Sequence, residues 1–234
     1  MTTPSDSSKP ESPGITREML ENWRVALLAR ERDGAEASIA SEDQLLESRR
    51  LVIADDADVS DFWVFGYGSL IYNPIIEHSQ RAITSIYGYH RRLCLWTKIG
   101  RGSPDCPGLV LSLDRGGSCK GVAFRLNPQN AIAELDLLWR REMMTMAYRP
   151  RLISLHTDIG LKRGLAFVAN PTRPAYAQPM PFEATVEVVA HAAGFNGPCR
   201  EYLYDTIKGM QACGIRDHQL EKLAAAVQQR LASQ

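Results

Sequence analysis

The segment Asp61-Phe-Trp-Val-Phe-Gly-Tyr-Gly-Ser-Leu-Ile-Tyr-Asn-Pro74 carries more information about the fold than any other stretch of the chain. The aromatic and β-branched run from Phe62 to Phe65 predicts a strand. It leads into Gly66-Tyr-Gly-Ser69, where two glycines allow a sharp turn and the close approach of a ligand to the backbone. Because successive N–H groups in such a turn can converge on an oxyanion, we predict a strand followed by an anion-binding loop. A plain glycine turn is the alternative.

Three common motifs do not account for this loop. A dinucleotide fingerprint needs a third glycine where Ile71 stands, and no Gly-Lys-Ser/Thr follows as a P-loop requires. A nucleophile elbow around Ser69 would need glycines in place of Tyr67 and Ile71. The sequence of the loop therefore argues against a dinucleotide site, a nucleotide P-loop and a serine hydrolase.

Further motifs follow the loop in the order of a known family. They are Gly88-Tyr-His-Arg-Arg92, Gly100-Arg-Gly-Ser-Pro104 with Pro107-Gly108, Gly121-Val-Ala-Phe-Arg-Leu126, Leu138-Trp-Arg-Arg-Glu-Met143 and Glu201-Tyr-Leu203. Together with Val64 to Ile71 they resemble the ChaC-type γ-glutamylcyclotransferases. The resemblance covers roughly residues 61 to 231 and, more weakly, the N-terminal region, as in the bacterial members. The chain departs from the family's usual form at Phe195 to Arg200.

The resemblance implies both a fold and a reaction. The implied fold is α+β, with a small, mostly antiparallel β-barrel flanked by helices and the glycine loop at its mouth. The implied function is a carbon–nitrogen lyase that cleaves glutathione to 5-oxoproline and Cys-Gly. Cyclisation of other γ-glutamyl amines or dipeptides is one alternative. A non-catalytic regulatory binder of the same fold is another, because the ChaC name carries an older association with cation transport regulation.

Composition limits the possible partners. Lys plus Arg and Asp plus Glu both number 27, so the formal net charge is zero, which argues against nucleic acid or an anionic membrane. No apolar stretch approaches the ~20 residues of a membrane span, and the N-terminus has no apolar signal core. The five cysteines form no Cys-x-x-Cys pair, and the histidines lack metal-binding spacing. We therefore expect a cytoplasmic protein with reduced thiols and no metal. We also expect a monomer, and the reaction that the resemblance implies requires no cofactor.

The chain divides into three predicted parts. Residues 1–14 are poor in apolar side chains and should form a disordered tail. Residues 15–60 should form a helical extension, with one helix capped by Thr16 and running to about Arg32, and a second begun by a capping box at Ser41 and Gln44. Residues 61–234 should form the γ-glutamylcyclotransferase-like catalytic domain.

Within the third part, short β-like runs alternate with turns. The predicted strands are Phe62–Phe65, Ala82–Tyr89, Arg92–Thr97, Gly108–Leu113, Lys120–Leu126, Arg151–His156 and Gly164–Val168. Helices are predicted at about 128–146, 199–211 and 217–231, the first starting at Asn127-Pro128 and the last capped by Asp217. Strands grouped together with few crossover helices favour an α+β, barrel-like sheet.

A carboxylate interrupts the apolar stripe of the first of these helices. The stripe comprises Ile132, Leu135, Leu138, Trp139, Met143 and Met146. Glu142 lies within its arc, whereas Glu134, Arg140 and Arg141 should point to other sides. Burying Glu142 costs several kcal/mol unless it is paired, protonated or facing a cavity. The plain interpretation is an ion pair with a core arginine.

The resemblance gives Glu142 a catalytic role, because it occupies the position of the family's catalytic glutamate. In a γ-glutamyl peptide the α-amine attacks the γ-carbonyl of the same residue, so the substrate itself supplies proximity. A carboxylate with a raised pKa could take a proton from the α-ammonium and pass it to the departing nitrogen. Desolvation on an apolar face raises the pKa of a glutamate in the required direction.

The remaining candidates would bind the substrate. They are Phe65, Gly66, Tyr67, Gly68, Ser69, Leu70, Arg101 and Tyr148, with Tyr202 as a further pocket-lining or core residue. The amides of the loop would stabilise an oxyanion, and Arg101 would clamp a carboxylate unless it is a solvated loop arginine. Tyr67 would either orient the substrate or wall the pocket. Cys94 and Cys106 have no neighbouring histidine or helix start that would activate a thiol nucleophile.

Overall fold

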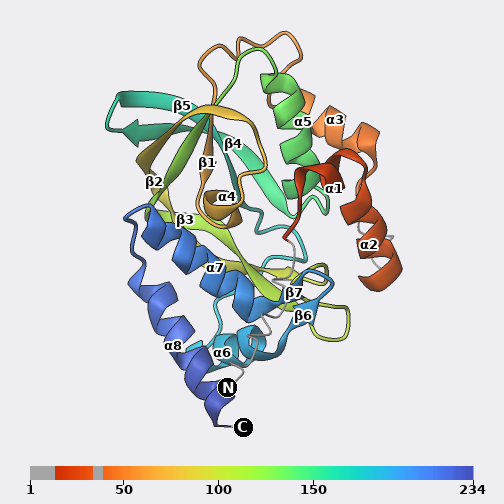
Figure 1. Ribbon diagram of the computed structural model, residues 1–234, viewed down its shortest axis with the longest axis vertical. Coiled ribbons are helices and arrows are strands. Elements are labelled where there is room, and N and C mark those ends of the chain that lie inside the picture. The colour runs from red at the N-terminus through yellow and green to blue at the C-terminus, as the bar shows by residue number, and fades with distance from the viewer. Residues whose placement is uncertain (1–13, 34–38, 234) are drawn as a thin grey trace, which may run out of the picture.

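A computed structural model describes residues 14–33 and 39–233, and its centre is a closed β-barrel (Figure 1). The barrel strands are β1 (Trp63–Gly66), β2 (His78–Thr97), β3 (Gly108–Leu126), β4 (Tyr148–Thr157) and β5 (Gly160–Ala169), in the order β1-β3-β2-β4-β5. The β1–β3, β2–β3, β2–β4 and β4–β5 pairs are antiparallel, whereas β5 pairs with β1 and β3 in parallel. The prediction of an α+β fold with a mostly antiparallel barrel is confirmed.

The strands β2 and β3 form one long hairpin, and here the predicted boundaries were wrong. The four runs predicted between Ala82 and Leu126 are two continuous strands. The register shifts between Tyr87 and Tyr89, and Gly88 has a φ of 83°. Glycine at positive φ is typical of a β-bulge, which bends a strand without ending it. Gly88, inside the predicted strand Ala82–Tyr89, therefore marks a bulge, and β2 continues through residues 90 and 91, where a break between two strands was predicted.

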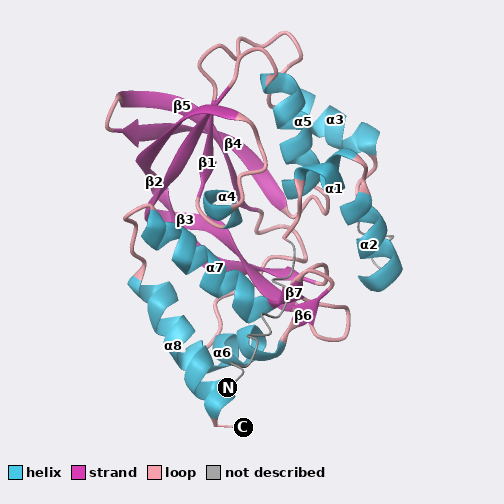
Figure 2. Ribbon diagram, in the orientation of Figure 1, coloured by secondary structure: helices cyan, strands magenta, loops and turns pink. Residues whose placement is uncertain are grey.

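Eight helices surround the barrel within the described residues (Figure 2). They are α1 (Arg17–Glu21), α2 (Arg24–Asp33), α3 (Glu42–Arg50), α4 (Ser69–Tyr72), α5 (Ala131–Glu142), α6 (Phe182–His191), α7 (Cys199–Ala212) and α8 (His218–Ala232). In this view α1, α2, α3 and α5 lie on one side of the barrel, and α6, α7 and α8 pack together at its lower end. A small two-stranded sheet joins β6 (Ala193–Gly194) to β7 (Gly197–Pro198).

Some of the predicted helix ends are confirmed, and others are wrong. The side chains of Thr16 and Asp217 cap α1 and α8, and Ser41 forms the predicted capping box. The first helix, however, breaks before Arg24, because Trp23 adopts a φ of 57°. Likewise α5 starts at Ala131, since the residues after Asn127 form a turn. The helix α6 was not predicted.

The described N-terminal extension packs against α5. Arg17 Nη1 and Nη2 donate to the two carboxylate oxygens of Glu134 at 2.7 and 2.8 Å. Glu134 is 1% exposed, so the prediction that it faces away from the core was wrong. Residues 1–13 of the predicted tail lie outside the described residues, whereas Gly14 is described and lines the cavity discussed below.

The core is continuous from the barrel into its helical cover. Trp139 of α5 packs edge-on against Phe167 of β5, with ring centroids 5.2 Å apart, and both side chains are almost fully buried. This packing fixes the C-terminal turn of α5 against the barrel, near the loop that follows β1. Among the helices in the described ranges, none combines the length and apolarity needed to span a bilayer.

Candidate active site

The glycine loop passes from β1 directly into a single turn of helix. Gly66 ends β1 and α4 begins at Ser69, so the apolar residues after the loop do not resume a strand. A Cβ at Gly66 would lie 3.0 Å from the Phe124 ring, and one at Gly68 would lie 3.1 Å from the hydroxyl of Tyr202. Close approach by neighbouring side chains therefore explains both glycines.

Two cavities meet beside this loop. The inner one has a volume of about 20 Å³ and is bounded by residues 67–70. The outer one has a volume of about 370 Å³, within the range of ~300–1,000 Å³ typical of small-molecule pockets. Four side chains line both cavities: Ser69, Glu142, Tyr148 and Tyr202. A ligand in the outer cavity could thus place one end against the loop and Glu142.

Glu142 is the last residue of α5, and its side chain is 12% exposed. Its Oε1 lies 3.2 Å from Nε of Arg141, an ion pair without hydrogen-bond geometry. Desolvation raises the pKa of Glu142 above its ordinary value, and the Arg141 charge opposes part of that rise. The expected ion pair with an arginine is therefore present, yet burial outweighs it. Glu142 is a candidate proton acceptor and donor facing a cavity.

Arg141 is the site residue that the sequence pattern placed wrongly. Predicted to point away, its side chain is instead 6% exposed and faces the loop. Nη1 donates to the carbonyl oxygen of Asn73 at 2.5 Å, and Nη2 donates to Oγ of Ser69 at 2.7 Å. These bonds hold both ends of α4 against the end of α5. The adjacency of Arg141 to Glu142 was visible in the sequence, but its acceptors, about 70 residues away, were not.

Three tyrosines enclose the inner cavity, of which Tyr67 and Tyr202 are buried and Tyr148 is partly exposed. The hydroxyl of Tyr67 donates to the carbonyl of Phe167 at 2.7 Å, and that of Tyr148 donates to the carbonyl of Leu111 at 3.2 Å. The hydroxyl of Tyr202 accepts from the backbone N–H of Leu111 at 3.2 Å. Burial raises the pKa of each tyrosine, so all three stay neutral.

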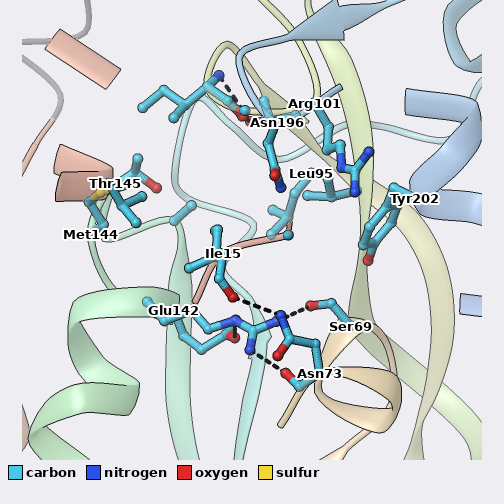
Figure 3. A pocket seen from close by; sticks show the side chains of 18 of the residues that line it. Ile15, Ser69, Asn73, Leu95, Arg101, Glu142, Met144, Thr145, Asn196 and Tyr202 are labelled. Carbon is cyan, nitrogen blue, oxygen red and sulfur yellow. Dashed lines mark hydrogen bonds and ion pairs between the residues drawn. The ribbon is translucent and has the colours of Figure 1, made fainter. Parts of the chain in front are cut away.

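Arg101 lies in the outer cavity, away from Glu142 in the view of Figure 3. It is 8% exposed, so it is not a solvated loop arginine. Nη1 donates to the carbonyl of Pro198 at 3.2 Å, and the carboxylates of Glu201 and Asp205 lie 3.7 and 4.0 Å from the guanidinium. The two acids are half-exposed and neither is at hydrogen-bond distance, so the guanidinium can accommodate an incoming carboxylate.

A close approach of the backbone positions Arg101. A Cβ on Gly102 would come within 2.2 Å of the amide nitrogen of Gly108 and 2.3 Å of the carbonyl oxygen of Thr97. Only glycine fits between the ends of β2 and β3, and this contact fixes the residue before it. The Gly-Arg-Gly motif therefore presents one arginine at the rim of the cavity.

The structure brings most of the predicted site residues together, but not all. Residues 67–70, Glu142 and Tyr148 meet at the inner cavity, and Arg101 lies in the outer one. Phe65 and Gly66 are buried in β1 behind the loop and line neither cavity. Several lining residues besides Arg141 were not predicted from the sequence: Ile15, Tyr72, Asn73, Thr145, Phe195 and Asn196. No local pattern distinguishes these from ordinary surface or core residues.

The cysteines do not provide a second nucleophile in the site. Burial raises the pKa of Cys94 to about 12 and the pKa values of Cys119 and Cys199 to about 11. Cys106 is exposed and lines neither of the two cavities beside the loop. Across the described ranges, no group of three or more His, Cys, Asp or Glu side chains could hold a metal ion.

The sequence is similar to a known family and to named relatives. The family model for ChaC-like proteins matches residues 62–230. The chain is 34% identical over 221 residues to the glutathione-specific γ-glutamylcyclotransferase of Escherichia coli (strain K12), covering 93% of this chain and 94% of that protein. It is 35% identical over 179 residues to glutathione-specific γ-glutamylcyclotransferase 1 of Homo sapiens, covering 74% and 80% respectively.

Solved structures show the same fold. A yeast γ-glutamyl cyclotransferase specific to glutathione superposes with a TM-score of 0.67 at 22% identity. The superposition covers 73% of this chain and 96% of the yeast chain. The superposed part of this chain therefore has the fold of that protein.

Proposed function

This chain belongs to the ChaC-like protein family, and from that premise we propose that it is a glutathione-specific γ-glutamylcyclotransferase. The reaction cleaves glutathione to 5-oxoproline and Cys-Gly. The observation that carries the proposal is the position of Glu142, a desolvated carboxylate with a raised pKa at the junction of the two cavities. Two relatives, aligned with 93% and 74% of this chain, are named for this activity, and their names support glutathione as the substrate.

The chemistry follows from the geometry of a γ-glutamyl group. Its α-ammonium must lose a proton before the amine attacks the γ-carbonyl, and the five-membered lactam forms as the amide C–N bond breaks. We place the α-amine and the scissile nitrogen on either side of Glu142, which takes the first proton and returns it to the departing nitrogen. The attacking nitrogen loses a second proton as the lactam forms, and the departing amine gains a second proton and leaves as an ammonium. The pKa of Glu142, raised by desolvation, brings its proton affinity closer to that of the amine.

The loop after β1 is the proposed site for the oxygen atoms of the γ-glutamyl group. The first N–H groups of a helix have no acceptor inside that helix, and α4 starts beside the inner cavity. Ser69 Oγ accepts from Arg141, so its single hydroxyl proton is left to donate. These donors would bind the substrate carboxylate and the developing oxyanion. Because the Tyr67 hydroxyl donates to Phe167, we assign Tyr67 to the cavity wall.

Arg101 is the proposed partner of the second carboxylate. Glutathione carries one carboxylate on its γ-glutamyl residue and one on its glycine. If the first lies at the loop, the second extends into the outer cavity, where Arg101 is buried and only loosely paired. A fork of guanidinium N–H groups suits a carboxylate.

We also propose that the enzyme acts in the cytoplasm as a monomer without a cofactor. All five cysteines are free thiols, which suits a reducing compartment. Every group used in the mechanism comes from one chain, and none of the proposed steps requires a bound metal or an electron carrier.

The direct test is to incubate the purified protein with glutathione and measure 5-oxoproline and Cys-Gly by mass spectrometry. The expected result is equal release of both products, with slower release from γ-Glu-Ala and γ-Glu-Lys. Faster release from either dipeptide would replace glutathione with a broader γ-glutamyl substrate class. Thermal stabilisation by glutathione without any product would favour a regulatory binder of the same fold.

A further inference from the structure

The outer cavity has an apolar wall that the proposed chemistry does not use. Five lining side chains belong to one hydrophobic cluster: Ile15, Val25, Ile99, Met144 and Phe195. Two of these, Ile15 and Val25, come from the N-terminal strap, which we define as residues 14–25. The family model begins only at residue 62, so the strap is outside it. The alignment with the Escherichia coli relative spans 93% of the chain and therefore includes most of the segment before residue 62.

Directed polar contacts hold the strap in place. Nδ2 of Asn73 donates to the carbonyl oxygen of Ile15 at 2.8 Å, and the carbonyl of Asn73 accepts from Arg141. Two residues further along, Arg17 binds both oxygens of the buried Glu134 and donates to the carbonyl of Ile75 at 3.2 Å. Asn73 therefore hydrogen-bonds both to the Ile15 carbonyl and to Arg141, which lies beside Glu142. These bonds fix a short segment that would otherwise have little core of its own.

The two cavities differ in the part of a substrate that each can hold. The inner cavity, at about 20 Å³, has space for about one water-sized group. The part of the substrate beyond the scissile bond must therefore lie in the outer cavity. In Figure 3 the Ile15 side chain occupies the middle of the view, with Glu142 on one side and Arg101 on the other. A leaving group that reaches from Glu142 toward Arg101 would pass the strap.

We propose that the strap forms the subsite for the Cys-Gly leaving portion, with Ile15 and Val25 contacting the cysteinyl side chain, and so favours the tripeptide over shorter γ-glutamyl compounds. This inference rests on the proposed function. A thiol on a single methylene behaves as a small hydrophobic group, which suits an aliphatic wall with a methionine. The glycine carboxylate then extends toward Arg101. In this arrangement the strap contributes to binding and leaves the proton transfers to Glu142.

The test compares two substrates in strap variants. Ile15→Ala should raise KM for glutathione roughly tenfold. Losing a methylene contact in an apolar pocket typically changes discrimination by ~10–200-fold. We expect the low end of that range because five side chains share this wall and four of them remain. The kcat value and the KM for γ-Glu-Ala, which lacks the thiol and the glycine, should change less than twofold. Val25→Ala should show the same pattern, and it replaces Ile15→Ala as the test if Ile15→Ala lowers the melting temperature.

A second pair of variants tests the anchor. Arg17→Gln should reproduce the selective KM increase, because it removes both bonds to Glu134, and Arg17→Lys should restore part of the loss. The matched control is Arg30→Ala, an exposed arginine of α2 outside the strap, for which both KM values should be unchanged. Equal KM increases for the two substrates, or an unchanged KM for glutathione in folded Ile15→Ala and Val25→Ala proteins, would overturn the inference.

Calorimetry separates failure of the strap from failure of the proposed function. Glutathione affinity is measured in an E142Q background with and without Ile15→Ala, where turnover does not interfere. A weaker Kd in the double variant by the same factor as the KM supports the subsite, and an unchanged Kd rejects it. Absence of 5-oxoproline with the wild-type protein rejects the proposed function, whatever the calorimetric result.

Discussion

Glu134 and Glu142 lie on the same helix, α5, and both are largely buried, but their surroundings differ. The Glu134 carboxylate accepts from two nitrogens of Arg17, from the backbone N–H of Glu77 at 2.9 Å and from Asn130 at 3.3 Å. The Glu142 carboxylate has one charged neighbour, Arg141, and faces two cavities. The first is saturated with donors, and the second is not.

This contrast shows that burial alone does not identify a reactive acid. A carboxylate whose oxygens are fully bonded is held rigid, so it joins two segments and has no capacity left for a substrate. A carboxylate with few donors in the same low-dielectric surroundings has a raised pKa and can exchange protons. We therefore expect Glu134 to control stability and Glu142 to control turnover.

The largest expected effect is the loss of activity in Glu142→Gln. General acid–base catalysis contributes roughly 10²–10⁴-fold, and the amide can neither accept nor return the proton, so kcat should fall by about that factor. Because the pKa of folded Glu142 is raised, its contribution to stability is present below the unfolded pKa and lost as pH rises through the folded pKa. At neutral pH the variant should thus be at least as stable as the wild type. The measurements are 5-oxoproline release and urea unfolding at pH 7.

Turnover near the wild-type value in folded Glu142→Gln protein would remove Glu142 from the mechanism. A large loss of stability would show instead that the Arg141 contact is mainly structural.

The second prediction concerns Glu134→Gln, in which the opposite pattern is expected. The amide cannot bind Arg17 through two charged oxygens, so the free energy of unfolding should fall by roughly 2 kcal/mol. The kcat value of the folded protein should change less than about threefold, because Glu134 lines neither the inner nor the outer cavity. Urea unfolding and steady-state kinetics on the same sample measure both quantities. A kcat loss comparable to that of Glu142→Gln would mean that the two carboxylates are not separable.

The smallest effect is a shift in pH dependence. The base must be ionised, so activity should rise with pH through the pKa of Glu142, at a pH above that of an ordinary glutamate (~4.3). The Arg141 charge lowers this pKa, so Arg141→Gln should move the rise in kcat/KM to higher pH. The control is Arg151→Gln, an exposed arginine on β4. A profile that stays in place or moves to lower pH in Arg141→Gln would contradict the assigned electrostatics.

The sequence predicted best what depends on neighbouring residues. The caps at Thr16, Ser41 and Asp217 each rest on a bond to a residue three positions on, so the local pattern contains the whole interaction. The glycine loop and the stripe around Glu142 were visible for the same reason. The barrel itself was predicted from the order of the strands together with the family resemblance.

What the sequence did not show depends on distant partners. Glu134 appeared exposed because Arg17, its partner, lies 117 residues away, and Arg141 appeared peripheral because Ser69 lies 72 residues away. The strand was predicted to end at Tyr89 because the ladder that continues past it depends on pairing with β3. The periodicity of apolar residues predicts which face of a helix or strand is buried. It does not predict which charged side chain from a distant segment will pair with a residue on that element.

The buried thiols described above have a consequence for a protein that would work in glutathione-rich surroundings. Cys94, Cys119 and Cys199 have pKa values of about 11 to 12, so at neutral pH almost none of each thiol is present as thiolate. Mixed-disulfide formation with an oxidised form of the substrate requires a thiolate that solvent can reach. These three buried thiols should thus resist S-glutathionylation, leaving the exposed Cys106 and the half-buried Cys213 as the positions where such an adduct could form.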